Sequence, residues 1–225
     1  FRTPMSTFEN TTYLLSELLR QTSTGVIQLP EFQRGWIWDD DQIKDILVSI
    51  AGKYPVGSVT LLEYADKNLL KTRPVEGLGK SVPKGCEPEM LILDGQQRLS
   101  SLVRCAFLDT PVDTFTASRK SIRRYYYIDI EKAVTGNIEA AVFSVDERRE
   151  LRDNAAKKVK LKLHSSEQEF RAKCFPCHLI MKSDEWEVGF LKANPGDAKL
   201  LDEFREQVLD AFRTFSVPVT LLKRD

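Results

Sequence analysis

The chain has 225 residues, 42% of them hydrophobic and 29% charged, which is enough to bury a core and is an ordinary globular balance. Its 33 basic and 33 acidic residues cancel, so DNA binding would have to come from a local basic patch. No apolar run reaches the roughly 18 residues of a membrane-spanning helix, and no signal-peptide pattern opens the chain. We therefore expect a cytoplasmic protein that does not engage a membrane.

The spacing of apolar residues predicts the regular elements in chain order. Helical stripes predict helices over 11–21, 39–51, 95–108 and 199–212, and Asp39 with Gln42 forms a capping-box pattern. Runs of β-branched and aromatic residues predict strands over 26–29, 57–63, 89–93, 124–130, 142–145, 174–181 and 214–222. The charged segment 146–162 lacks an apolar stripe and is expected to be an exposed helix or loop.

The segment 66–88 is predicted to be a long loop, because it holds three prolines and three glycines. Its basic residues outnumber its acids, so it either touches phosphates or is a solvated insertion. The irregular mixture of strands and helices indicates an α+β fold with a small mixed sheet flanked by helices. Because no convincing linker is present, we expect one domain over 1–225.

Four cysteines are present: Cys86, Cys105, Cys174 and Cys177. The sequence from Cys174 to Cys177 and His178 matches a haem-attachment pattern and also offers three zinc ligands. Haem attachment requires export, and a closed zinc site requires a fourth ligand. We therefore interpret these residues as buried thiols in a strand and predict no metal site on the chain itself.

The segment Leu93-Asp94-Gly95-Gln96-Gln97-Arg98-Leu99 is the first candidate for chemistry. An apolar strand ends at Asp94, Gly95 permits a tight turn, and the following helix offers unpaired N–H groups that favour anions. Arg98 adds a planar cation suited to phosphate oxygens. The alternative is structural, with Asp94 capping the helix and Arg98 making a surface ion pair.

The segment from Pro30 to Asp39 is the second candidate, because two tryptophans lie beside a glutamine and an arginine. Aromatic rings next to arginine can stack on a base, and Gln33 and Arg34 can read base edges or hold phosphate. The alternative is a hydrophobic staple, in which Trp36 and Trp38 pack across the start of the next helix.

Together, Pro30, Phe32-Gln33-Arg34, Trp36 and Trp38, followed by Asp94 to Leu99, resemble the N-terminal domain of GmrSD-type modification-dependent restriction enzymes. The same domain occurs in the phosphorothioation-sensing defence protein SspE. The resemblance implies a ParB/sulfiredoxin-like fold in which a Gly-x-x-Arg turn contacts nucleotide phosphate. It also implies hydrolysis of a nucleoside triphosphate such as GTP, which controls cleavage of foreign or modified DNA.

The resemblance carries over to numbered residues of this chain. The residues that it assigns to catalysis are Asp94, Gln97 and Arg98. Those that it assigns to nucleotide binding are Gly95, Gln96, Gln33 and Arg34. For DNA binding it assigns Gln33 and Arg34, and we add the neighbouring aromatic residues Phe32 and Trp36. Phe32 stands where tyrosine is common in the family, so a phenol contact would be missing there.

The expected function is therefore an NTPase and sensor domain that uses Mg²⁺, binds DNA and acts with a nuclease. We expect that nuclease to be a C-terminal domain outside this chain or a partner subunit, because His164 and His178 form no nuclease motif. The alternatives are that this domain is itself the endonuclease, or that it is a non-enzymatic module binding modified DNA. The preferred nucleotide, the sensed modification and a homo-oligomeric state are left open.

Overall fold

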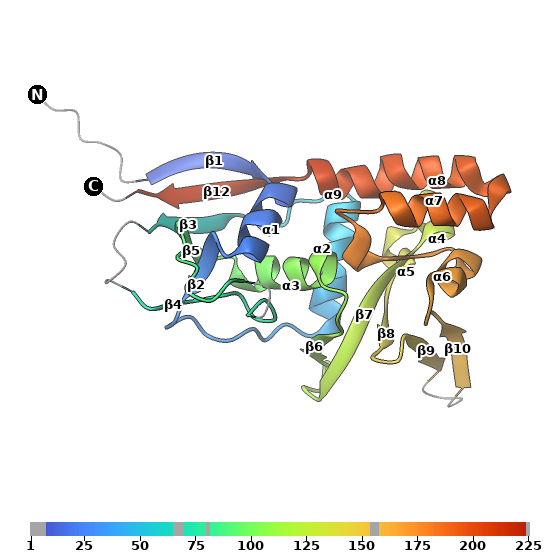
Figure 1. Cartoon of the computed structure of the whole chain (residues 1–225), viewed down its shortest axis with the longest axis horizontal. Helices are drawn as coiled ribbons and strands as arrows, with labels where there is room; N and C mark the ends of the chain where they lie inside the picture. Colours follow the sequence, from blue (N-terminus) through green and yellow to red (C-terminus); the bar gives the residue numbers. More distant parts are fainter. Residues whose placement is uncertain (1–7, 65–69, 80–81, 154–157, 224–225) are drawn as a thin grey trace, which may run out of the picture. The chain divides into compact units, whose positions relative to one another are not determined.

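The computed structural model describes residues 8–64, 70–79, 82–153 and 158–223 (Figure 1). Contacts within the chain divide it into two compact units, and each is described by itself. Unit 1 comprises Phe1–Trp36, Val56–Val103 and Thr214–Asp225, and unit 2 comprises Ile37–Pro55 and Arg104–Arg213. The mixture of helices and mixed sheets confirms the α+β class. The ParB/sulfiredoxin-like arrangement and the single domain over 1–225 stay predictions.

Unit 1 is built on a six-stranded sheet in the order β1-β12-β3-β5-β2-β4. Its strands are β1 (Phe8–Leu14), β2 (Ile27–Pro30), β3 (Val59–Glu63), β4 (Thr72–Arg73), β5 (Met90–Asp94) and β12 (Ser216–Leu222). β12 runs parallel to β3, β2 runs parallel to β5, and the other neighbouring pairs are antiparallel. The side chains of Ile27, Leu29, Leu61, Leu91 and Ile92 are fully buried, so these strands form the core of the unit.

Two helices follow strands of this sheet along the chain. The expected helix over 11–21 is wrong at its start, because Phe8–Leu14 is a strand and α1 spans Leu15–Thr24. The threonines before Leu15 suit a strand, and their partner is β12 at the other end of the chain. The predicted leucine stripe is confirmed, since Leu15, Leu18 and Leu19 are fully buried. Helix α3 spans Gln96–Phe107, close to the expected range.

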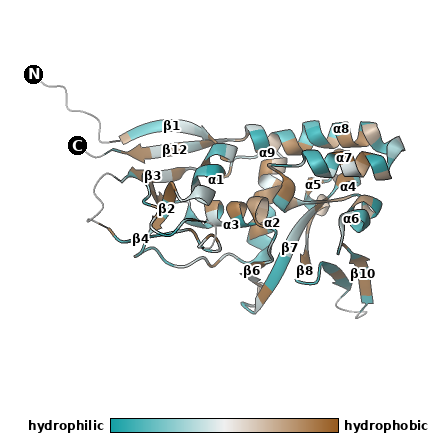
Figure 2. Ribbon diagram, viewed as in Figure 1, coloured by the Kyte–Doolittle hydropathy of each residue, from teal (hydrophilic) through white to brown (hydrophobic). Residues whose placement is uncertain are grey.

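Unit 2 contains most of the helices. They are α2 (Asp40–Ala51), α4 (Ile130–Val134), α5 (Ile138–Ala141), α6 (Ser166–Ala172), α7 (Asp184–Ala193), α8 (Ala198–Phe204) and α9 (Asp210–Thr214), with short turns at Cys177–Leu179 and Pro195–Asp197 and a π-helical turn at Arg205–Leu209. The capping box of α2 is confirmed, because Asp39 and Gln42 each accept the other's backbone N–H. Helices α7 and α8 carry both hydrophobic and hydrophilic residues (Figure 2). No helix in the described part of the chain is long and apolar enough to cross a membrane.

The strands of unit 2 form a sheet around β7 (Ser121–Asp129) and a separate hairpin. β7 pairs antiparallel with β6 (Val112–Phe115), β8 (Val142–Asp146) and β11 (Cys174–Pro176). The expected exposed helix or loop over 146–162 is wrong, because β9 (Glu150–Asp153) and β10 (Lys158–Lys162) pair there. Leu151 and Leu161 pack against a buried cluster with Tyr127 and Val145, so two apolar residues hold a mostly charged segment in place.

The cysteine-rich segment also differs from its predicted form. The strand expected over 174–181 stops at Pro176, because Cys177–Leu179 turns into a 3₁₀ helix. Cys174 and Cys177 are buried and unpaired by disulfides, as the interpretation of buried thiols expects. Burial raises the pKa of Cys174 to about 12, so its thiol is protonated at neutral pH. Within the described residues, no group of three or more His, Cys, Asp or Glu is arranged to hold a metal ion.

Candidate functional site

The candidate site begins where β5 ends and α3 begins, in unit 1. Asp94 is the last residue of β5, and its side chain is 73% exposed. Gly95 has a φ of +88°, a left-handed conformation that favours glycine, and a Cβ there would lie 2.9 Å from Cγ2 of Val59. This tight turn leaves the first N–H groups of α3 without partners inside the helix, which gives that end a partial positive charge.

Arg98 lies one turn into α3 and closes one side of the site. Its Nη1 donates to the carbonyl of Val56 at 2.6 Å and its Nη2 to the carbonyl of Ser58 at 2.7 Å. Nη2 also lies 3.5 Å from a carboxylate oxygen of Asp94. Gly57 has a φ of +80°, and a Cβ on it would lie only 2.1 Å from Nη1. The absence of a side chain at Gly57 therefore makes the room that the guanidinium occupies.

Three glutamine side chains join the two sequence motifs. Gln33 donates from Nε2 to the carbonyls of Ile92 at 3.2 Å and Leu93 at 2.8 Å, on the strand that ends at Asp94. In return, Nε2 of Gln96 donates to the carbonyl of Arg34 at 2.8 Å, and Nε2 of Gln97 to that of Gly35 at 3.3 Å. The turn after β2 is thus held against the start of α3 by amide-to-backbone hydrogen bonds.

Trp36 completes this attachment. Its indole Nε1 donates to Oγ of Ser101 at 2.9 Å, and that hydroxyl donates to the carbonyl of Gln97 at 2.8 Å. Trp36 is therefore bound to α3 through its polar edge, whereas the expectation for it was contact with DNA. The carbonyl of Trp38 accepts from the hydroxyl of Thr114 within unit 2.

Phe32 and Arg34 are exposed residues of the turn, as are Glu31 and Gly35. The side chain of Phe32 is 70% exposed, which is unusual for a large apolar residue. Arg34 is exposed, and its guanidinium makes no ion pair or hydrogen bond with any residue that the structure describes. Together with Asp94, these two side chains are predicted site residues that lie exposed to solvent.

Sequence reasoning missed several residues that shape the site. Gly57 and the carbonyls beside it were treated only as the start of a strand, although a glycine there is the signal for a close approach. Arg73, in the segment expected to be a loop, donates from Nη2 to the carbonyl of Gln33 at 3.1 Å and pairs with Glu76 at 2.7 Å. Ser101, which accepts the indole N–H of Trp36, was not among the predicted site residues.

Two comparisons with known proteins found matches to this chain. A protein of Methanocaldococcus jannaschii described as uncharacterized is 27% identical over 135 residues, which cover 58% of this chain. The aligned part is 22% of that protein, so the chain matches about a fifth of its curated relative. The family described as GmrSD restriction endonuclease, N-terminal domain, matches residues 15–220, which include both motifs and the strands that position them. The chain therefore belongs to the family of GmrSD restriction endonuclease N-terminal domains.

Proposed function

We propose that this domain hydrolyses a nucleoside triphosphate, GTP in the first place, and couples turnover to recognition of modified DNA in an antiviral restriction system. The observation that carries this proposal is the N-terminus of α3, set between the exposed Asp94 and the guanidinium of Arg98. A helix N-terminus beside a guanidinium is suited to phosphate oxygens, because both present N–H donors and positive charge. The family supports the restriction role.

Each side chain has a part in this proposal. Gly95, Gln96 and the N–H groups at the start of α3 hold the phosphates. Gln97 orients the attacking water. Arg98 uses two of its five N–H donors on the carbonyls of Val56 and Ser58, and the others remain to stabilise charge on the γ-phosphate. Catalysis of this kind is mainly positioning and electrostatic stabilisation.

Asp94 is the residue that would hold Mg²⁺. Nucleotide sites commonly bind this ion through one or two carboxylates together with the substrate's phosphates, so a single exposed carboxylate fits. When bound, the ion neutralises phosphate charge. Asp94 itself contributes a fixed carboxylate, because Arg98 lies beside it and the turn at Gly95 sets its direction.

DNA would be contacted through the turn after β2. Phe32 offers an exposed ring for stacking, and Arg34 offers an exposed cation for phosphate or a base edge. Gln33 binds the backbone of β5, so it would link this turn to the nucleotide site instead of reading a base itself. The nuclease is assigned to a C-terminal domain or a partner subunit.

Phosphate release from GTP, ATP, CTP and UTP with Mg²⁺, with and without DNA, tests the proposal. We expect Asp94→Asn and Arg98→Ala each to lower kcat by roughly 100-fold or more, since each removes charge stabilisation at the reacting phosphate. Asp41→Asn is the matched control, because Asp41 is an exposed carboxylate in the first turn of α2. Turnover that is unchanged in folded Asp94→Asn protein would exclude the assigned site.

A second function is favoured by a specific observation: the side chains of Gln33, Gln96, Gln97 and Arg98 all donate to backbone carbonyls. If these four side chains have a purely structural role, the domain is a DNA-binding module. The exposed Phe32 and Arg34 then bind DNA without nucleotide turnover. In that case Arg34→Ala weakens DNA binding, while Arg98→Ala lowers only the stability. Absence of turnover with any of the four nucleotides would support this second function.

A further inference from the structure

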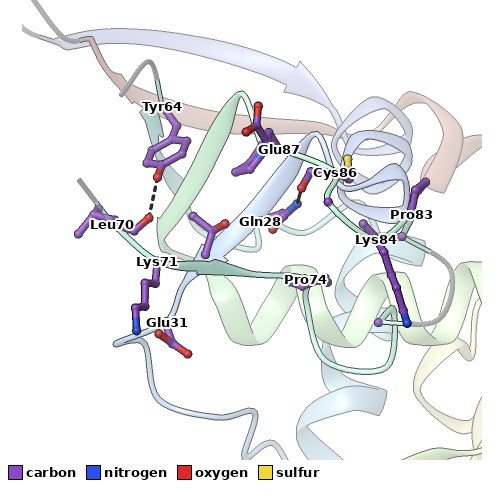
Figure 3. A pocket seen from close by; sticks show the side chains of 15 residues that line it. Gln28, Glu31, Tyr64, Leu70, Lys71, Pro74, Pro83, Lys84, Cys86 and Glu87 are labelled. Carbon is purple, nitrogen blue, oxygen red and sulfur yellow. Dashed lines mark hydrogen bonds between the residues drawn. The ribbon is translucent and has the colours of Figure 1, made fainter. Parts of the chain in front are cut away.

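A separate hollow of about 650 Å³ lies in unit 1 between β2, β4 and the segment 82–88 (Figure 3). Its volume falls in the range of roughly 300–1,000 Å³ that small-ligand pockets occupy. The hollow shares only Glu31 with the turn of the candidate site, so it is a different place on the same unit. The N–H of Glu31 donates to the carbonyl of Lys71 at 2.8 Å, which ties the rim of the hollow to that turn.

Gln28 supplies a buried acceptor that faces this hollow. The residue is only 2% exposed, and its Nε2 donates to the carbonyls of Gly25 at 3.0 Å and Cys86 at 2.9 Å. Two carbonyls on the same atom fix the orientation of the amide, because an oxygen placed there would meet two acceptors. Figure 3 shows this nitrogen turned toward Cys86. No donor among the described residues reaches Oε1, so this oxygen is open to an N–H or O–H from solvent or from a ligand in the hollow.

The walls and the rim specify the rest of the ligand. The lining contains the apolar side chains of Leu70, Pro74, Val82, Pro83 and Pro88 beside polar ones. Two exposed cations, Lys71 and Lys84, lie at the rim without an ion pair to any described residue. A flat ring with an N–H donor and an attached phosphate satisfies all three features, and a nucleotide is such a molecule.

The charge of the rim distinguishes between two sources of a nucleotide. Glu31 also lines the hollow. Its carboxylate repels the several charges of a free triphosphate more strongly than the single charge of a phosphodiester.

We propose that this hollow receives one base everted from a DNA strand, with an N–H of the base donating to Oε1 of Gln28 and the flanking phosphates beside Lys71 and Lys84. The proposal rests on the DNA-recognition part of the proposed function. It assigns base inspection to the hollow and nucleotide turnover to the start of α3. The hydrogen bond between Glu31 and Lys71 connects the two places.

The test adds a side chain at the edge of the hollow, at a position with room for it. Gly79 lines the hollow, has an ordinary φ and has open space where a Cβ would stand, so Gly79→Phe adds a ring to the lining. Gly196→Phe is the matched control, because Gly196 also has an ordinary φ and open space but lies in unit 2. The probes are two fluorescein-labelled duplexes, one fully paired and one with a single mismatch, and binding is followed by anisotropy.

We expect the wild-type chain and Gly196→Phe to bind the mismatched duplex about tenfold more tightly, because a mismatched base costs less to evert. Gly79→Phe should bind both duplexes equally and retain the nucleotide turnover of the wild type. The double variant Lys71→Gln/Lys84→Gln should reduce the slope of log affinity against log salt by about 0.9 for each phosphate that the protein no longer neutralises.

Three results would overturn the proposal: equal binding of both duplexes by the wild type, a mismatch preference that survives in Gly79→Phe, or no DNA binding. Turnover abolished by Gly79→Phe would instead assign the hollow to the free nucleotide, and it too would overturn the assignment to a DNA base. Because turnover is measured separately, a wild type that hydrolyses normally but shows no mismatch preference rejects this inference alone. Absence of hydrolysis with a preference that depends on Gly79 rejects only the proposed NTPase.

Discussion

Two polar networks, one in each unit, are built on opposite principles. In unit 1, neutral amides of Gln33, Gln96 and Gln97 donate to backbone carbonyls and leave the charge of Asp94 73% exposed. In unit 2, the carboxylate of Glu169 is only 4% exposed and lies among other side chains. The network in unit 1 positions a loop around an open site. The network in unit 2 links side chains in the interior of that unit.

The interior network of unit 2 centres on Glu169. It accepts from the hydroxyl of Tyr127 at 3.2 Å and the indole of Trp186 at 3.0 Å, and it lies 3.6 Å from the guanidinium of Arg149. Burial raises the pKa of Glu169, while the hydrogen bonds from Trp186 and Tyr127 oppose that rise. Arg149 also stacks over the ring of Tyr125 at 4.2 Å and pairs with Asp109. In this chain the buried charge anchors an interior, whereas the exposed charge of Asp94 lies beside a loop that neutral amides hold in place.

The largest expected effect comes from removing the buried carboxylate. Glu169→Ala should lower the free energy of unfolding by about 3–5 kcal/mol, because it removes the buried carboxylate that accepts from Tyr127 and Trp186 and lies beside Arg149. Urea unfolding measures this change. Nucleotide turnover per folded molecule should stay at the wild-type level.

Glu131→Ala is the control for this variant, since the side chain of Glu131 is 61% exposed and pairs with Lys173 at the surface. It should cost about 0–1 kcal/mol. Similar losses in the two variants would show that the interior network is no stronger than a surface ion pair, and the contrast between the two units would disappear.

Gly57→Ala should lower the free energy of unfolding less than Glu169→Ala does. It should also lower turnover, because it acts on the open site of unit 1. The new Cβ lies 2.1 Å from Nη1 of Arg98, so either the guanidinium or the loop from Val56 to Ser58 must move. We expect turnover to fall at least about tenfold and stability to fall by about 1–3 kcal/mol, the usual range for a residue in a sparsely populated conformation.

Gly136→Ala separates the two causes of that loss. Gly136 has a φ of +82°, nearly the same as Gly57, but a Cβ there meets nothing within 4 Å. It should therefore show the conformational cost alone, with turnover unchanged. If both variants lose the same stability and neither loses turnover, the position of Arg98 does not matter for the reaction.

The smallest expected effect is a pH dependence in unit 2. Burial and the nearby Arg149 and Lys182 lower the pKa of His178 below its ordinary value of 6.5, although Asp109 opposes the shift. The unfolded chain then binds the proton more readily than the folded one. The stability that neutral His178 contributes is therefore fully present above about pH 6.5. It is lost as the pH falls through the lowered pKa of the folded state.

Urea unfolding of the wild type and His178→Gln at about pH 8 and about pH 5.5 measures this dependence. The wild type should lose more stability on acidification than the variant. The raised pKa of Glu169 acts with the opposite sign, since its contribution is present at low pH and is lost as the pH rises through its pKa. An equal loss in both proteins would show that His178 is not the titrating group.

The sequence predicted the strand-to-helix junction well because its causes are local. The apolar run before Asp94, the glycine after it and the stripe from Leu99 onward lie within one short segment. The meeting of Gln33, Gln96 and Gln97 with distant carbonyls could not be predicted from periodicity, because those bonds join residues about 60 positions apart. The resemblance to the family indicated that the two motifs belong to one site. The structure showed which atoms join them.

The failures have the opposite cause, since each depends on a distant partner. Phe8–Leu14 is a strand because Ser216–Leu222 pairs with it, and the β9–β10 hairpin persists because Leu151 and Leu161 reach the cluster around Tyr127. The strand after Cys174 ends early because only Cys174 to Pro176 pair with β7. Local propensity carries no information about such partners.

The place of β12 in the sheet has a consequence for synthesis on the ribosome. β12 lies between β1 and β3, so the edges of both strands stay open until Ser216–Leu222 has been translated. Every residue of unit 2 emerges before that strand does. A nascent chain stalled before Ser216 thus already contains both motifs, yet it presents unpaired backbone N–H and C=O groups to chaperones and to neighbouring chains.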